Sequence, residues 1–193
     1  MTDRRIWSTE RAAGYFFVLG FVTCVAGAVM YTIRGGPSGG IPPSYTFFVF
    51  ERSFFIAAVI ATVIGVVLLE GYLNNTDGRV LARTGATTYL FAGIMLVAAE
   101  ALFLSPGFGP SFEKRGYALI VVCVVLAFLA QALIGGALLQ SGLLAAWIGW
   151  ATIVWSLGSL VVLVVIMSGD LYIPIMHEIM PLLIGTALLW RRS

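Results

Sequence analysis

Four ionisable side chains interrupt apolar stretches that are long enough to cross a bilayer: Glu51, Glu100, His177 and Glu178. A charge in hydrocarbon costs about 2.5–3.5 kcal/mol on insertion scales, so such residues are usually paired or functional. At about 1.5 Å per helical residue, all four lie roughly 6–10 Å inside the same end of their predicted spans. We therefore predict that they share one level in the outer third of the membrane.

The chemistry expected of such a group is proton handling. When carboxyl groups and an imidazole share one low-dielectric pocket, their pKa values spread apart, so that one group becomes a proton donor and another a proton acceptor. Such a pair suits proton relay, acid catalysis or cation binding. Arg52 stands beside Glu51 and offers a structural alternative. It either pairs with Glu51, Glu100 or Glu178, or extends to the membrane interface. Both interpretations stay open from the sequence.

The pair His177-Glu178 lies between Pro174 and Pro181. Proline has no backbone N–H, so Pro181 leaves the carbonyl of His177 without its helical donor and predicts a kink. The pair is not a zinc motif, because H-E-x-x-H requires a second histidine. One histidine and two separated cysteines, Cys24 and Cys123, build neither a metal nor a redox site. No metal and no cofactor are expected.

Four further residues are candidates for lining a pocket. They are Tyr89, Trp155, Ser156 and Ser159. Both serines belong to a stripe of small residues with helical spacing on the fifth span, which is typical of helix packing and, less commonly, of a water-lined path. Gln131 is predicted to lie too deep for the cluster and to bond across to the fifth span.

The elements that carry these residues follow from composition. The chain has 193 residues, of which 60% are hydrophobic and 10% charged, whereas soluble domains have about 25% charged residues. A spanning helix needs about 20 apolar residues. We predict an all-α bundle in a single domain, residues 1–193, with spans at about 12–33, 47–70, 85–104, 117–140, 144–167 and 171–190. Short breaks at 141–142 and 168–170 predict that the last three helices are antiparallel neighbours.

Basic residues set the predicted orientation. Seven lie on the side of the termini (Arg4, Arg5, Arg11, Arg79, Arg83, Arg191 and Arg192) and four on the other (Arg34, Arg52, Lys114 and Arg115). Both termini are therefore expected in the cytoplasm. The sequence resembles small bacterial integral membrane proteins, so we expect a multi-pass protein of a bacterial inner membrane. The lipid bilayer is the expected partner. A small-molecule or ion ligand, a second copy of the chain and a membrane complex are the further partners that the sequence leaves open. A net charge of +2 without a basic patch gives no reason to expect nucleic acid.

Three classes of function fit this pattern. The first is a protein that binds or transports a small molecule or an ion through the protonatable pocket. The second is a structural or accessory subunit whose polar residues only hold helices together. The third is a membrane enzyme that uses a carboxylic acid as general acid on an isoprenoid or quinone-like substrate.

Overall fold

The computed structural model describes residues 8–34, 44–105, 110–163 and 174–191. In these ranges the chain is helical and contains no strand. The helices are α1 (Thr9–Ile33), α2 (Tyr45–Leu73), α3 (Arg79–Phe103), α4 (Pro110–Ser141), α5 (Ala146–Val161) and α6 (Ile179–Trp190), with a 3-10 turn, η3 (Pro174–His177), directly before α6. The prediction of an all-α bundle with six helices is confirmed.

Four of the helices are long and apolar enough to cross a membrane. They are α1, α2, α3 and the part of α4 from Arg115 to Ser141, with 25, 29, 25 and 27 residues. Each exceeds the approximately 20 residues that a bilayer requires. Their outward faces carry exposed valine, leucine, isoleucine and phenylalanine side chains, whereas glycine, alanine and polar residues are common inside. This inside-out distribution is the one expected for helices surrounded by lipid.

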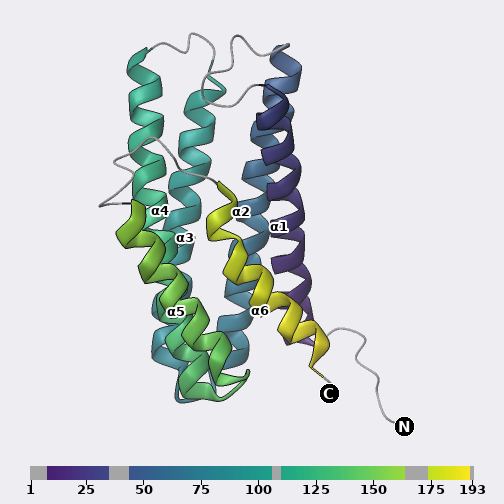
Figure 1. The fold of residues 1–193 in the computed structure, drawn as a ribbon, viewed down its shortest axis with the longest axis vertical. Helices are drawn as coiled ribbons and strands as arrows, with labels where there is room; N and C mark the ends of the chain where they lie inside the picture. Colours follow the sequence, from purple (N-terminus) through teal and green to yellow (C-terminus); the bar gives the residue numbers. More distant parts are fainter. Residues whose placement is uncertain (1–7, 35–43, 106–109, 164–173, 192–193) are drawn as a thin grey trace.

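The helices pack in the order that their connections dictate, with one exception. The pairs α1–α2, α2–α3, α3–α4 and α4–α5 are neighbours, but α6 contacts α5 only slightly and packs mainly against α1. In Figure 1, α5 and α6 flank the lower half of the bundle, and α6 starts near mid-height. The prediction that helices five and six are neighbours is therefore wrong.

Close glycine contacts explain where the two short helices dock. A Cβ atom at Gly185 of α6 would lie 2.9 Å from the carbonyl oxygen of Gly14 in α1. On the other side of the bundle, a Cβ atom at Gly135 of α4 would lie 2.8 Å from the carbonyl oxygen of Gly149 in α5. Both distances are too short for any side chain, so glycine is what lets each short helix approach its long partner.

The structure describes only part of each of the last two predicted spans, 144–167 and 171–190. The helices α5 and α6 contain 16 and 12 residues, or about 24 and 18 Å at 1.5 Å per residue. Residues 164–173 lie outside the described part of the chain. The described helical segments are thus too short, each by itself, for a hydrocarbon layer of about 30 Å.

The beginning of α1 and the end of α6 lie at the same end of the bundle (Figure 1). This agrees with the packing, because a Cβ atom at Gly14 would lie 2.9 Å from Cγ of Leu189. That this end faces the cytoplasm stays a prediction. The tight reversal between α4 and α5 runs through Gly142, whose φ of 60° lies in the left-handed region that glycine favours.

Candidate functional site

The predicted polar residues form two groups at different depths. Glu51, Arg52 and Glu100 meet near one end of the bundle, whereas Glu178 hydrogen-bonds to Thr62. Thr62 lies eleven residues beyond Glu51 on α2, which is about 16 Å along the helix axis. The prediction of one shared level is therefore wrong. Its error lies in the starting point of α6, which begins deep in the bundle instead of at its edge (Figure 1).

The first group is a chain of alternating charges, here called the ion-pair cluster: Arg34, Glu51, Arg52 and Glu100. Arg34 at the end of α1 donates to both carboxylate oxygens of Glu51, with Nε–Oε2 and Nη2–Oε1 distances of 2.8 and 3.1 Å. This fork is the strong, bidentate form of an ion pair. Arg52 Nη2 lies 3.4 Å from Glu51 Oε1, and Arg52 Nη1 lies 3.3 and 3.2 Å from the two oxygens of Glu100.

Aromatic rings surround the two guanidinium groups. The Arg52 guanidinium carbon lies 4.9 Å from the ring centres of both Phe48 and Phe103. The Arg34 guanidinium carbon lies 5.0 Å from the Tyr31 ring centre. Cation–π contacts of this kind strengthen when water is excluded. They replace part of the hydration that the arginines lose.

The ion-pair cluster connects α1, α2 and α3 and leaves little spare bonding capacity. Two positive and two negative groups balance, and every carboxylate oxygen has an arginine donor within 3.4 Å. Burial of charges is tolerated only with such partners. This arrangement is a closed clamp, which favours the structural interpretation for Glu51, Arg52 and Glu100.

The second group, here called the inner polar site, consists of Thr62, Tyr89, Gln131, His177 and Glu178. The Glu178 side chain is completely buried. Its Oε2 accepts a hydrogen bond of 2.7 Å from the Thr62 hydroxyl. Its Oε1 lies 3.2 Å from His177 Nε2, but accepts no hydrogen bond of regular geometry from a described residue. One carboxylate oxygen is thus firmly held, and the other faces an imidazole.

The break before α6 is held by side chains from other helices. Because Pro181 cannot donate to the His177 carbonyl, Gln131 Nε2 of α4 donates to it instead, at 2.5 Å. The indole nitrogen of Trp155 in α5 donates to the Met176 carbonyl at 3.1 Å. Backbone groups that a broken helix frees inside a membrane need partners of this kind.

Of the four predicted lining residues, Tyr89, Ser156 and Ser159 are buried and Trp155 is half-buried. The Tyr89 hydroxyl is buried near the Gln131 amide and the Glu178 carboxylate, without completing a regular hydrogen bond. Ser156 Oγ lies 3.4 Å from Gln131 Oε1 and donates to the Thr152 carbonyl at 2.6 Å. Ser159 is buried one turn further along the same face of α5. Trp155 contacts the backbone of η3 as described above.

Sequence reasoning missed three members of these groups. The sequence predicts Arg34 only as a charge that sets orientation, gives no role to Thr62, and predicts Gln131 to lie outside the cluster. Gly20 is a fourth omission, because a Cβ atom there would collide with Thr62 Oγ1 and lie 3.3 Å from Glu178 Oε2. The spacing of Gly20, Cys24 and Gly27 was the available signal. The three small residues share one face of α1, which leaves room there for side chains of neighbouring helices.

The inner polar site is suited to holding a proton. Glu178 Oε1 and His177 Nε2 lie 3.2 Å apart, a distance over which a carboxyl and an imidazole can exchange a proton. In the described part of the chain, no three His, Cys, Asp or Glu side chains group together as metal ligands would.

The fold and the site define an all-helical protein with four helices capable of crossing a membrane and a buried carboxyl–imidazole pair beside them. Comparisons with protein-family models, with curated proteins and with solved structures found no match.

Proposed function

We propose that the protein resides in a membrane and binds or transports a small molecule or an ion, with Glu178 as the group that takes up and releases a proton. The observation that carries the proposal is the complete burial of the Glu178 carboxyl at the start of α6, against Thr62 and His177. The proposed proton site lies near mid-depth, whereas the sequence predicts a pocket in the outer half of the membrane.

The position of Glu178 supports reversible protonation. Thr62 lies about 26 Å from the start of α2 and about 16 Å from its end, so the carboxyl is far from both surfaces. Ionisable groups at such depth are costly and commonly mark proton relays or ion pathways. A proton also needs no cavity, which suits a site packed among six helices.

The short helix α6 supports the same proposal. In many membrane carriers, interrupted helices place their termini and free backbone groups beside the bound ion or substrate near the midplane. Glu178 occupies the N-cap position of α6, where the helix dipole favours negative charge.

Proton movement in proteoliposomes tests the proposal. A potassium diffusion potential, set by valinomycin, drives protons inward, and an enclosed pH dye reports them. We expect the wild type to exceed protein-free vesicles, Glu178→Gln to fall to their level, and Glu10→Gln, in the first turn of α1, to match the wild type. Equal flux in wild type and Glu178→Gln, or no flux above empty vesicles, contradicts the proposal.

A second candidate, a structural or accessory subunit, is supported by the closed ion-pair cluster. Its bidentate contacts serve to hold α1, α2 and α3 together. In that case polar variants lower stability without a specific loss of proton movement, and the protein co-purifies with larger membrane partners. The third class, an enzyme with a general acid, gains no support from Glu51 and Glu100, because each lies against arginine.

A further inference from the structure

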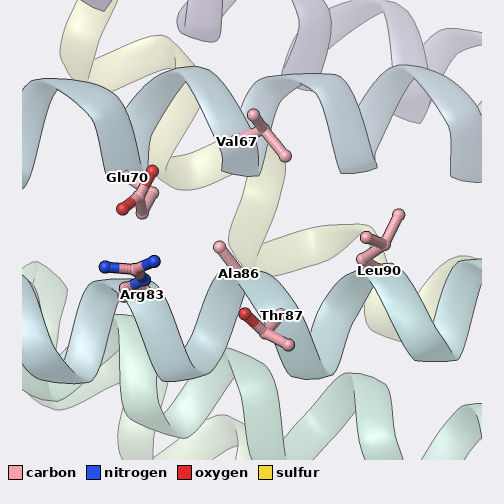
Figure 2. A pocket seen from close by; sticks show the side chains of 6 residues that line it. All are labelled: Val67, Glu70, Arg83, Ala86, Thr87 and Leu90. Atoms are coloured by element: carbon pink, nitrogen blue, oxygen red, sulfur yellow. The ribbon is translucent and has the colours of Figure 1, made fainter.

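A hollow opens on the outside of the bundle along the seam between α2 and α3, at the end where the two helices are joined. It has a volume of about 230 Å³ and is lined by Val67, Glu70, Arg83, Ala86, Thr87 and Leu90. In Figure 2, the side chains of Glu70 and Arg83 point toward one another across the space between the helices. None of these residues belongs to the ion-pair cluster or to the inner polar site.

The two opposite charges in the hollow do not pair. Glu70 and Arg83 form no ion pair within 4.0 Å, although four other acid–base pairs in the described ranges do. Neither side chain has an ion-pair partner among the residues that the structure describes, so both are available to a ligand in the space between them. A ligand that carries one negative and one positive group matches both at once.

The depth of the hollow matches the surface of a bilayer. Glu70 is three residues before the end of α2 and Arg83 four residues after the start of α3, so both lie about 5–6 Å from the helix ends. Val67 and Leu90 lie further from the connection and are about half exposed, at 47% and 45%. The hollow is thus polar at the level of the membrane interface and apolar at the level of the hydrocarbon.

We propose that this hollow binds the head group of a zwitterionic phospholipid with a primary amine, such as phosphatidylethanolamine. Arg83 contacts the phosphate, Glu70 accepts hydrogen bonds from the ammonium group, and one acyl chain runs along Val67 and Leu90. A primary ammonium donates hydrogen bonds to a carboxylate, whereas a quaternary choline has no N–H to donate. The proposal depends on membrane insertion and is independent of the proton chemistry at Glu178.

Native mass spectrometry of the purified full chain tests the site, with phosphatidylethanolamine, phosphatidylcholine and phosphatidylglycerol of identical acyl chains. We expect phosphatidylethanolamine to bind tightest. Loss of one charge-assisted contact, worth about 1.5 kcal/mol at least, weakens it about tenfold in Glu70→Gln and in Arg83→Gln. Arg79→Gln is the matched control, since Arg79 lies at the same interface but does not line the hollow.

Three results would overturn the inference. The first is equal retention of phosphatidylethanolamine in the wild type and both variants, which would mean adventitious lipid only. The second is tighter binding of phosphatidylglycerol that increases in Glu70→Gln, which would indicate an anion site. The third is effective competition by glycerophosphoethanolamine, which has the same head group but no acyl chains and would indicate a soluble ligand.

Discussion

The Thr62 hydroxyl donates a 2.7 Å hydrogen bond to Glu178 Oε2, and both side chains are completely buried. The bond joins the middle of α2 to the N-cap residue of α6, 116 positions later in the chain. It fixes the depth of the carboxyl and the point where α6 begins. The predictions below follow from this contact and from those around it.

Thr62→Val should destabilise the protein and Thr62→Ser should not. Valine has nearly the shape of threonine but cannot donate, so it leaves a buried carboxylate oxygen without a partner, at a cost of about 1–3 kcal/mol. Serine retains the hydroxyl. Unfolding in mixed detergent and SDS measures both free energies. Equal stability of the two variants would show that the bond contributes nothing.

Gly20→Ala should disturb the inner polar site, whereas a glycine-to-alanine change at an open position should not. The new methyl group would collide with Thr62 Oγ1, and overpacking of an interior commonly costs about 1–3 kcal/mol. Gly158→Ala is the matched control, because a Cβ atom there meets nothing within 4 Å. Thermal unfolding in detergent should show a lower midpoint for Gly20→Ala alone; similar midpoints would refute this packing.

Arg34→Gln should be strongly destabilising, by about 3–5 kcal/mol, because it leaves the buried Glu51 with fewer compensating charges. The double variant with Glu51→Gln should recover part of this loss, since no uncompensated carboxylate remains at that position. A double-mutant cycle on the unfolding free energies measures the coupling. Additive effects of the two single changes would argue against the bidentate pair.

Gln131→Leu should destabilise the start of α6, because the His177 carbonyl loses its donor while Pro181 cannot supply one. Adding Pro181→Ala should restore part of the stability, since alanine provides a backbone N–H at the helical position. SDS unfolding of the single and double variants tests this. If Pro181→Ala only adds to the damage, the proposed role of the glutamine is wrong.

The sequence predicted the helices better than it predicted the site. Runs of more than 20 apolar residues located the first four spans to within a few residues at most ends, because hydrocarbon thickness sets their length. The sequence could not show that α6 starts near mid-depth, because residues 171–190 are mostly apolar and composition does not reveal where a helix begins. The prolines around His177-Glu178 indicated a break there, and the break proved decisive for depth.

The partner of each polar residue could not be predicted from the sequence either. The sequence predicts three possible carboxylate partners for Arg52. Only the packing of the helices determines that Arg52 pairs with Glu51 and Glu100, while Glu178 hydrogen-bonds to Thr62. The same holds for Gln131, whose partner on α5 was predicted but whose contact with η3 was not. Depth along a helix can be counted, but which faces meet depends on the close glycine contacts between helices.

Infrared spectroscopy of the protein in lipid, recorded as a function of pH, tests the central claim most directly. The carbonyl stretch of a protonated carboxylic acid reports Glu178 without needing a ligand. The nine Asp and Glu side chains all contribute to this band when protonated, so the Glu178 component is the difference between the wild type and Glu178→Gln. We predict that this difference band is present in the folded protein and persists when both proteins also carry Glu100→Gln. Identical pH-dependent spectra of the folded wild type and Glu178→Gln would contradict the account.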